Sequence, residues 1–282
     1  MNILISVNDN FVNQAITMLY SLRMNFRGGV NVFHLSITIS ENGLKTLQEF
    51  VEEKLNGRFI SIKPDDAFLK ELPLYSKRFS IETYSRIIAQ DVLPSEVDRI
   101  LWLDADMIIC KDIEEFYNMG FGNKAIICAA DLRQDALAAH KSNLGISQGD
   151  IYFNAGVILF NLNKLRLEYP KNKVYECIKE IEAELIYQDQ DILNVLYSQD
   201  KKIVDYKVYN YQLDCEKNIP KELIGNIVVL HYTGKAKPWI YRNIAPSSMP
   251  YWNVVRKMGG HNIQYLIASM VLFLKKICNK CN

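Results

Sequence analysis

The chain of 282 residues has little of what marks the specialised classes of protein. Only 13 residues are Gly and 8 are Pro, which excludes collagen-like chains and disordered chains rich in these two residues. Neither a G-x-G-x-x-G motif nor a Walker loop is present, which argues against a Rossmann dinucleotide site and against a P-loop. The first residues have no basic region and no small-residue cleavage site, so they predict a β-strand rather than a signal peptide.

Cysteine is also sparse, with six residues in the whole chain. Cys110 and Cys128 lie in apolar runs, which predicts buried thiols. Cys278 and Cys281 form a C-x-x-C pair, but neither a redox βαβ unit nor a second zinc half accompanies it. We therefore expect a reduced, cytoplasmic protein.

Acidic residues are absent after Glu222, although the net charge of the chain is only +1. The small net charge gives no reason to expect a nucleic-acid partner. Eight basic residues follow Glu222: Lys235, Lys237, Arg242, Arg256, Lys257, Lys275, Lys276 and Lys280. Such an imbalance predicts a surface that meets anions, either phosphate groups or an acidic membrane.

Residues 245–282 differ in kind from the rest of the chain. Within them, residues 262–274 carry no charge, a length too short to span a bilayer. One interpretation is a buried C-terminal helix. The other is a helix at the membrane interface, anchored by Trp252, Tyr265 and Phe273, with its lysines on anionic head groups. The missing acids favour the membrane interface.

Apolar runs of strand length alternate with segments of helical periodicity along the chain. We expect strands at residues 2–7, 30–39, 58–62, 99–110, 124–130, 152–162 and 226–232, and helices at 11–26, 41–55, 81–93, 171–185 and 189–199. This alternation predicts an α/β fold, a Rossmann-like, mostly parallel sheet flanked by helices. Residues 1–244 are expected to form one catalytic domain, and 245–282 a basic helical tail. Ligands of such sheets bind beyond the carboxyl ends of the strands.

Two carboxylates, Asp104 and Asp106, interrupt the apolar run of residues 101–109. A buried ionised side chain without a partner is costly, so either the chain leaves the sheet here or a cation lies beside it. Hard divalent cations prefer carboxylate oxygens, and Mn²⁺ also accepts imidazole. A single D-x-D is common by chance, so its apolar flanks carry the interpretation.

His231 ends a second apolar run and is followed by Gly234, Lys235 and Lys237. A lone His at a strand end is more often structural than a ligand. Here, however, glycine allows a ligand to approach the backbone closely, and the lysines favour phosphate oxygens. An imidazole for a metal beside ammonium groups for phosphate predicts a site for a metal-bound diphosphate.

Three further segments are polar where an apolar element would be expected. Asn154-Ala155-Gly156 interrupts a strand, as either a bulge or a polar floor beneath a hydroxyl-rich ligand. Asp189 either caps a helix or binds sugar hydroxyls together with its amide neighbours. Asn8-Asp9-Asn10-Phe11 follows the first strand, where such sheets bind nucleotides, and Phe11 can stack on a base.

Taken together and in this order, these segments resemble the family 8 glycosyltransferases, a retaining group that includes lipopolysaccharide galactosyltransferases and glycogenin. The resemblance covers most of residues 1–240 and rests on six motifs: N-D-N, S-I-E-T-Y-S-R, L-D-A-D, F-N-A-G-V, Y-Q-D-Q-D-I-L-N and H-Y-T-G-K-A-K-P-W. It implies a GT-A fold, a UDP-sugar donor, Mn²⁺ or Mg²⁺ as cofactor, and formation of an α-glycosidic bond.

The resemblance also implies a role for each matching residue. The metal ligands are Asp104, Asp106 and His231; the uridine site is Asn8, Asn10 and Phe11; the diphosphate clamp is Gly234 and Lys237; the donor-sugar pocket is Arg86, Asp131, Asn154, Ala155, Asp189 and Gln190. Asp189 and Gln190 are the catalytic candidates. Asn8 and Phe11 depart from the Asp and Tyr frequent in relatives, yet an amide oxygen still accepts a hydrogen bond and Phe still stacks.

The expected function is therefore transfer of galactose or glucose from a UDP-sugar to a glycan or glycolipid acceptor in the synthesis of lipopolysaccharide or a surface polysaccharide. We expect the enzyme in the cytoplasm or at the inner face of the cell membrane, with the tail on an anionic surface. Three alternatives remain open: a nucleotidyltransferase of similar fold, which would release pyrophosphate; a glycogenin-like protein that glycosylates its own Tyr; and a non-catalytic binder of sugar nucleotides.

Overall fold

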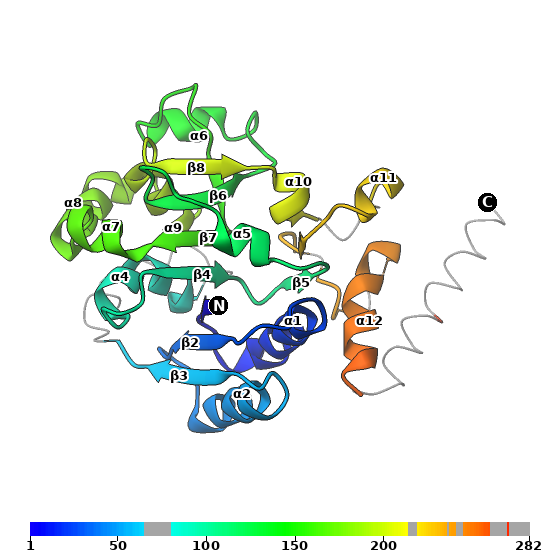
Figure 1. Ribbon diagram of the computed structural model, residues 1–282. Helices are drawn as coiled ribbons and strands as arrows, with labels where there is room; N and C mark the ends of the chain where they lie inside the picture. Colours follow the sequence, from blue (N-terminus) through cyan, green and yellow to red (C-terminus); the bar gives the residue numbers. More distant parts are fainter. Residues whose placement is uncertain (65–79, 214–218, 236, 241–244, 260–269, 271–282) are drawn as a thin grey trace, which may run out of the picture.

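The computed structural model describes residues 1–64, 80–213, 219–235, 237–240, 245–259 and 270 (Figure 1). A seven-stranded sheet forms its centre, in the order β3-β2-β1-β4-β7-β6-β8. The strands are β1 (Asn2–Ile5), β2 (Asn31–Leu35), β3 (Arg58–Ile62), β4 (Arg99–Leu103), β6 (Ile126–Ala130), β7 (Phe153–Asn161) and β8 (Lys201–Val204). β1, β2, β3 and β4 are parallel to one another, whereas β7 runs antiparallel to both β4 and β6. The expected mixed, mostly parallel sheet is confirmed.

A second sheet of three strands, in the order β5-β10-β9, lies beyond the end of β4. It contains β5 (Met107–Ile109), β9 (Tyr211–Gln212) and β10 (Val229–His231). The expected single strand over residues 99–110 was wrong, because the chain leaves the large sheet after Leu103 and enters the small one at Met107. The two aspartates occupy this crossing, as the cost of burying them within a strand requires.

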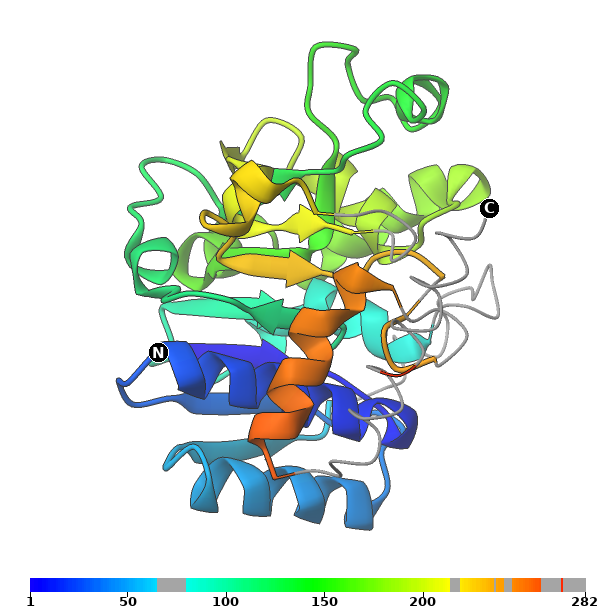
Figure 2. The same ribbon diagram turned by 90° about the vertical axis from the view of Figure 1, so that its right-hand side faces the viewer.

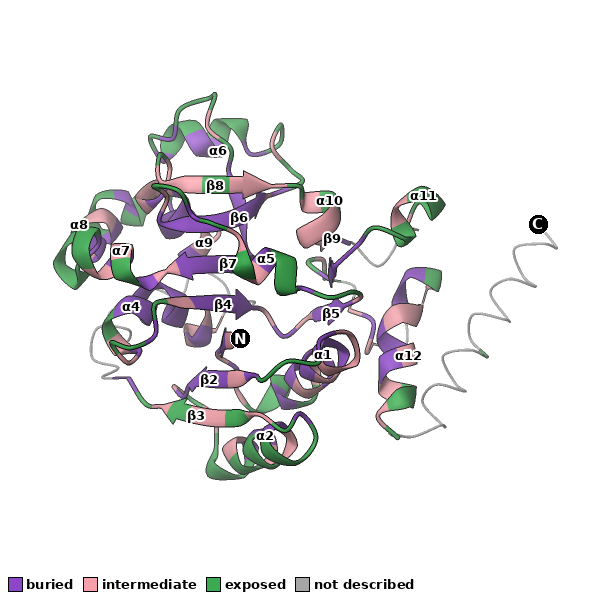
Figure 3. Cartoon of the chain, viewed as in Figure 1, coloured by how far each residue is buried: buried purple, intermediate pink, exposed green. Residues whose placement is uncertain are grey.

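Helices cover both faces of the large sheet, because side chains of successive strand residues point to opposite faces. One face packs against α1 (Val12–Asn25), α2 (Glu41–Glu53) and α5 (Glu114–Asn118) through residues such as Ile3 and Leu101. The other face packs through Leu4 and Trp102 against η2 (Ile81–Ile88), α4 (Ala89–Val92), α7 (Leu162–Glu168), α8 (Lys171–Ile181) and α9 (Asp189–Leu196). Figure 3 shows the buried strands between these two layers.

Several elements differ from expectation in type or extent. The expected helix over 81–93 is a 3₁₀ helix, η2, followed by one short turn of α-helix, α4. The helix expected over 171–185 ends at Ile181 and continues as η3 (Glu182–Glu184). Strand β8 was not expected, because its two lysines hide the apolar pattern. Other short helices were also missed, among them α5, α7, α6 (Ala138–Asn143), α10 (Tyr206–Tyr209), α11 (Lys221–Ile224) and η5 (Pro246–Ser248).

The first part of the basic tail packs against the rest of the described structure. Helix α12 (Met249–Lys257) lies across α1 in Figure 2, and the Tyr20 hydroxyl donates to the Lys257 carbonyl at 2.9 Å. Trp252 is 3% exposed within an apolar cluster, so the expectation that it anchors the chain in a membrane was wrong. Tyr265 and Phe273 lie outside the described residues. None of the helices in the described ranges has the length and apolar character needed to cross a bilayer.

Candidate active site

Polar side chains gather at one edge of the large sheet, where β1 and β4 end and β7 begins. β1 and β4 are parallel neighbours, so their carboxyl ends point the same way. β7 is antiparallel to β4, with Val157 opposite Leu103, so Asn154, Ala155 and Gly156 extend beyond the end of β4 beside Asp104. The topology thus brings segments from distant parts of the chain to one edge.

A cluster of possible ligands forms where the two sheets meet. Single ligand atoms of Asp104, Asp106 and His231 lie within 4.8 Å of one another. The antiparallel pairing of β10 with β5 sets His231 opposite Met107 and its Nε2 atom 3.2 Å from Asp106 Oδ1 and 3.9 Å from Asp104 Oδ2. Two carboxylates and an imidazole converge here, as the sequence predicted.

Lys237 adds a cation to this cluster. Its ammonium donates to Asp106 Oδ2 at 2.6 Å and also to the Tyr232 carbonyl. Burial by itself would raise the pKa of Asp106, but Lys237 and His231 outweigh it and hold that pKa well below its usual range. Asp106 is therefore a carboxylate at neutral pH.

Arg86 joins three parts of the site from the 3₁₀ helix η2. It is 4% exposed, and its guanidinium lies 4.4 Å from the centre of the Trp102 ring. Its nitrogens reach Asp104 Oδ1 at 3.1 Å, Asp189 Oδ2 at 3.0 Å and the Ala155 carbonyl. A rigid fork of donors suits this task, because guanidinium can bind several oxygens in one plane. Arg86 thus fixes the distance between Asp104 and Asp189.

Asp189 begins helix α9 and is almost completely buried. Burial raises the pKa of its carboxyl to about 6, with Arg86 opposing this effect and the charge of Asp104 adding to it. The preceding residue, Gln188, has a φ of 51°, a left-handed backbone conformation that turns the chain sharply into the helix. This turn directs the Asp189 side chain toward Arg86.

Gln190 lies at the centre of a hydrogen-bond network. Its amide oxygen accepts from the Ala155 backbone N–H at 3.0 Å and from Asn154 Nδ2 at 3.3 Å, and its amide nitrogen donates to Asp131 Oδ2 at 3.3 Å. Asp131 also accepts two hydrogen bonds from Arg133, from Nε to Oδ1 and from Nη2 to Oδ2, each at 2.9 Å. Burial raises the pKa of Asp131, but Arg133 more than compensates, so the pKa is lowered.

Asn210 extends this network to His231, and the sequence analysis missed it. The Gly156 backbone N–H donates to the Asn154 side chain, which identifies the facing atom as the oxygen, Oδ1. The Asn210 atom that contacts this oxygen at 2.9 Å is therefore the donor, Nδ2. The Asn210 oxygen then faces His231 Nδ1 at 2.9 Å. Because a carbonyl oxygen only accepts, Nδ1 donates to Asn210 and Nε2 faces the carboxylates. Asn210 precedes a two-residue strand, and nothing in its local sequence signals this role.

Gly156 is where the strand must lack a side chain. A Cβ atom there would lie 2.3 Å from His231 Cε1 and 2.9 Å from the Met107 methyl group. These distances are too short for van der Waals contact, so only glycine lets β7 pass the His231 ring at this position. The interruption noted in the sequence is therefore a packing requirement of the cluster.

The expected nucleotide-binding residues lie at the same edge but make few contacts with the cluster. Asn8 follows β1 and its side chain caps the short helix η1 (Asp9–Phe11) by accepting from the Asn10 N–H at 3.1 Å. Phe11 is 38% exposed, with its ring edge-on to Trp239 at 6.2 Å between centroids. Trp239 is the last residue of the H-Y-T-G-K-A-K-P-W motif. Gly234 lies in the bend between His231 and Lys237.

The expected residues thus form two groups. Contacts within hydrogen-bond or ion-pair distance connect ten of them: Arg86, Asp104, Asp106, Asp131, Asn154, Ala155, Asp189, Gln190, His231 and Lys237. Asn8, Asn10, Phe11 and Gly234 form the other group and border the first. The structure brings the residues together; their roles with a ligand remain predictions.

The comparison with protein families identifies the chain's relatives. The family model described as glycosyl transferase family 8 matches residues 2–243. A lipopolysaccharide 1,3-galactosyltransferase of Salmonella typhimurium is 31% identical over 185 residues, which cover 61% of this chain and 52% of that protein, so the chain spans about half of this relative. A lipopolysaccharide 1,2-glucosyltransferase of Escherichia coli is 25% identical over 282 residues, covering 91% of this chain and 82% of the relative.

Solved structures show the same fold. The galactosyltransferase LgtC, in complex with donor and acceptor sugar analogs, superimposes with a TM-score of 0.78 over 95% of this chain and 100% of its own, at 22% identity. The glycosyltransferase GlyE of Streptococcus pneumoniae gives a TM-score of 0.67 over 98% of this chain and 64% of its own, at 21% identity. The fold is therefore the GT-A fold that the sequence predicted.

Proposed function

The chain belongs to glycosyl transferase family 8, and we propose that it moves galactose or glucose from a UDP-sugar to a glycan or glycolipid acceptor, with retention of configuration and with Mn²⁺ as cofactor. The observation that carries this proposal is the cluster of Asp104, Asp106 and His231 at the meeting point of the two sheets. Lys237 lies beside the cluster, and the donor-sugar candidates adjoin it through Arg86.

The residues present fit a divalent cation. Asp106 Oδ1 is buried and has no hydrogen bond, although His231 Nε2 lies 3.2 Å away. The carboxylate oxygen and the ring nitrogen face each other across a short gap, where a cation could bind both. The oxygen and imidazole ligands suit Mn²⁺, with Mg²⁺ as the second candidate. Such an ion would neutralise charge on the diphosphate leaving group.

The proposed chemistry breaks the bond between the anomeric carbon of the donor sugar and the oxygen of the diphosphate. Negative charge develops on the leaving UDP, and the Lys237 ammonium, which lies beside Asp106, would stabilise it. Positive charge develops on the sugar ring, where the carboxylate of Asp189 would stabilise it. Arg86 holds that carboxylate in place at 3.0 Å.

The contacts of Gln190 favour attack on the same face from which UDP leaves. Its amide oxygen already accepts from Ala155 N and Asn154 Nδ2, so it is poorly disposed to attack the anomeric carbon, and an amide is a weak nucleophile. In the same-face route the acceptor oxygen bonds to the anomeric carbon, and the departing phosphate oxygen takes the acceptor's proton. Gln190 then serves to orient the donor sugar between Asn154 and Asp131.

The acceptor class follows from the relatives. Two relatives reported above are named for transfer to lipopolysaccharide, one of galactose and one of glucose. We therefore propose a lipopolysaccharide core or a similar surface glycan as acceptor. An acceptor of this kind is attached to a membrane, which agrees with peripheral binding through the basic tail. Membership of a glycosyltransferase family argues against the nucleotidyltransferase alternative.

A UDP-release assay tests the proposal. Purified protein is incubated with UDP-glucose, UDP-galactose and other UDP-sugars, with Mn²⁺ or with EDTA, and without acceptor. We expect slow release of UDP from one donor only, abolished by EDTA. If no donor yields UDP and calorimetry detects no binding of UDP, the proposed function is wrong. Intact-mass measurement of the same samples detects any self-glycosylation.

A further inference from the structure

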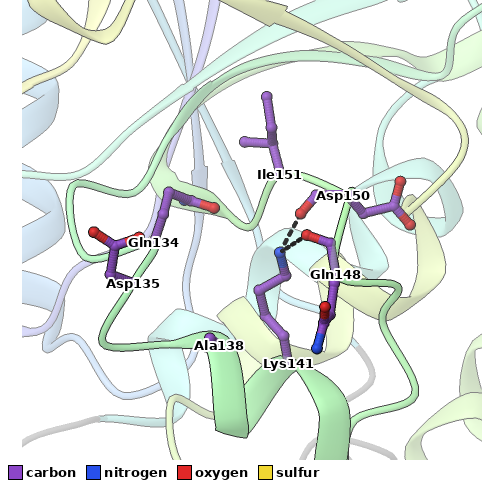
Figure 4. Close-up of a pocket in the computed structure, with 8 residues that line it drawn as sticks. Gln134, Asp135, Ala138, Lys141, Gln148, Asp150 and Ile151 are labelled. Carbon is purple, nitrogen blue, oxygen red and sulfur yellow. Dashed lines mark hydrogen bonds between the residues drawn. The ribbon is translucent and has the colours of Figure 1, made fainter.

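The segment that joins β6 to β7 holds a pocket that none of the roles above uses. The pocket has a volume of about 370 Å³. Its lining is Gln134, Asp135, Ala138, Lys141, Gln148, Gly149, Asp150 and Ile151. Figure 4 shows Gln134 and Asp135 on one side and Gln148 and Asp150 on the other, with Lys141 between them. The volume falls within the range of small-molecule sites.

Lys141 gives the pocket a preformed shape. Its side chain is buried, and its ammonium donates to the backbone carbonyls of Gln148, at 3.2 Å, and Asp150 (Figure 4). These two bonds tie helix α6 to the returning chain. Both partners are neutral carbonyls, so the positive charge of the ammonium stays at the pocket wall, and its third N–H remains to be donated.

The lining has the chemistry that recognises a sugar ring. Carboxylates accept hydrogen bonds from vicinal hydroxyls and amides both accept and donate them, and the lining includes one of each, in Asp135 and Gln148. Asp150 faces Lys141 with its backbone carbonyl, whereas its carboxylate points away from Lys141 and accepts from Gln199 Nε2 at 2.6 Å (Figure 4). Ala138 and Ile151 provide apolar surface for the C–H groups of a ring. One carboxylate and one ammonium balance each other's charge, which favours a neutral polyhydroxyl ligand over an anion.

The segment that forms the pocket is attached at both ends to the candidate donor-sugar residues. Its segment starts directly after Asp131 and ends at Tyr152, just before Asn154, and both Asp131 and Asn154 contact Gln190. Gln134 links the two ends of this segment, because its amide donates to the Asp131 and Tyr152 carbonyls and accepts from the Tyr152 N–H. Tyr152 and His140 also bind Asp191 of helix α9. The pocket therefore has a fixed position relative to the donor-sugar candidates.

We propose that this pocket is a second saccharide subsite, which holds a sugar ring of the acceptor glycan at a distance from the hydroxyl that is glycosylated. The inference rests on the proposed function in taking the ligand to be the acceptor. The subsite would let the enzyme select acceptors by a ring that takes no part in the reaction.

Substitutions on helix α6 test the subsite. Ala138→Trp places a large ring in the pocket, whereas Ala139→Trp places the same ring on a neighbouring exposed position, about 100° around the helix and outside the lining. Gln148→Ala is a second variant, which removes a hydrogen-bonding group from an exposed side chain. Each protein is applied to an array of bacterial surface oligosaccharides, and its affinity for UDP is measured by calorimetry.

We expect wild-type protein to bind a set of oligosaccharides that Ala138→Trp and Gln148→Ala bind at least about tenfold more weakly, the equivalent of one or two hydrogen bonds. Ala139→Trp should bind as wild type does, and all four proteins should bind UDP equally. The inference is overturned if Ala138→Trp binds the array as wild type does, or if wild type binds no saccharide that Ala138→Trp loses. Failure of the proposed function shows separately, as absence of UDP release from wild-type protein.

Discussion

The two carboxylate oxygens of Asp106 have different surroundings. Oδ2 accepts from Lys237 at 2.6 Å, whereas Oδ1 is buried beside His231 Nε2 without a hydrogen bond. Asp106→Asn keeps the size of the side chain but replaces one acceptor with a donor, which would repel both a cation and Lys237. We expect loss of UDP release by at least about a thousandfold, as for other essential electrostatic contacts. Electron paramagnetic resonance of bound Mn²⁺ should show lost affinity.

Asp98→Asn is the matched control for this experiment. Asp98 is an exposed acid just before β4, six residues before Asp104, the first candidate ligand. The substitution makes the same change of charge outside the cluster, so the UDP release and Mn²⁺ affinity of this variant should equal those of wild type. Normal turnover of Asp106→Asn with unchanged dependence on Mn²⁺ would refute the assignment of the metal ligand.

Asn210 makes the tautomer of His231 a testable property. Its oxygen accepts from His231 Nδ1 at 2.9 Å and so leaves Nε2 free to bind a cation. Asn210→Leu removes the acceptor at nearly constant volume, and we expect Mn²⁺ affinity to fall about 10- to 100-fold, the range for partners of metal-binding histidines. Isothermal titration of Mn²⁺ measures this without reliance on activity.

Asn210→Asp separates orientation of the ring from simple packing. The aspartate still accepts from Nδ1, so its Mn²⁺ affinity should exceed that of Asn210→Leu. Equal loss in both variants would mean that Asn210 acts through packing or through Asn154 instead. Nitrogen-15 spectra of the imidazole would report directly which ring nitrogen is protonated.

The sequence predicted the residues of the site better than it predicted their contacts. Asp104, Asp106 and His231 could be found because acids and an imidazole are conspicuous beside apolar strands. Asn210 could not, since its role depends on Asn154, which lies 56 positions earlier in the chain. Likewise Arg86 was expected to bind the donor sugar, but its contacts with Asp104 and Asp189 follow only from the packing of η2 against the sheet.

At the scale of elements, the ends of β1 and β2 are joined by a buried histidine. His34 Nε2 lies 3.2 Å from both the backbone N and the backbone O of Val7, and His34 Nδ1 lies 2.8 Å from the Ser36 hydroxyl. This contact supports the chain just before Asn8, where the nucleotide is expected to bind.

His34 should make stability depend on pH. Burial lowers the pKa of its imidazole from 6.5 to about 4. The unfolded chain therefore takes up this proton below about pH 6.5, and the folded protein does not until about pH 4. The free energy of unfolding should fall across this window as the pH is lowered, by up to about 3 kcal/mol from this group.

Chemical denaturation of wild type and His34→Gln from pH 4 to pH 8 measures this contribution. Other groups titrate in both proteins, so the difference between the two curves isolates His34. We expect the variant to be less stable than wild type at pH 8 and to lose less of its stability as the pH falls. Parallel curves would show that His34 does not titrate with the shifted pKa.

The type of an element could be predicted from the sequence where the apolar pattern was strong. The prediction failed where tertiary contacts decide the conformation. β1, β3, β6 and β7 were expected close to their observed ends, because apolar runs between turn signals leave few alternatives. That the chain leaves the large sheet after β4 was one of the two expected possibilities. That β5 then joins a second sheet, paired with a segment over 100 residues later, was not expected. η2 took the tighter 3₁₀ form, in which Arg86, Tyr84 and Ile87 are all buried.

At the scale of the whole molecule, the uneven charge coincides with the arrangement of the fold. Lys237 approaches the acidic cluster, whereas Arg256 and Lys257 end α12, which packs against α1. The positive charge that follows Glu222 therefore lies in at least two places, the candidate site and the end of α12. Three of these lysines, Lys275, Lys276 and Lys280, lie beyond the described residues.

The tail can be tested by a truncation that spares the packed part. Removing residues 260–282 leaves α12 and its contact with Tyr20 in place. Three lysines at an anionic surface contribute about 1 kcal/mol each, so we expect roughly 100-fold weaker binding to vesicles containing anionic lipid. Activity on a small soluble acceptor should stay at the wild-type level, because all the candidate site residues precede residue 240.

A charge-only variant distinguishes the two forces that would hold the tail on a membrane. Lys275→Gln, Lys276→Gln and Lys280→Gln together remove the charge and keep the uncharged run of residues 262–274. If charge dominates, this triple variant should bind anionic vesicles as weakly as the truncation does, and added salt should weaken wild type in the same way. If the apolar run dominates, the triple variant should retain binding that the truncation loses. Cosedimentation in which all three proteins bind equally would mean that the tail does not contact the membrane, and the interpretation as a buried C-terminal helix would replace it.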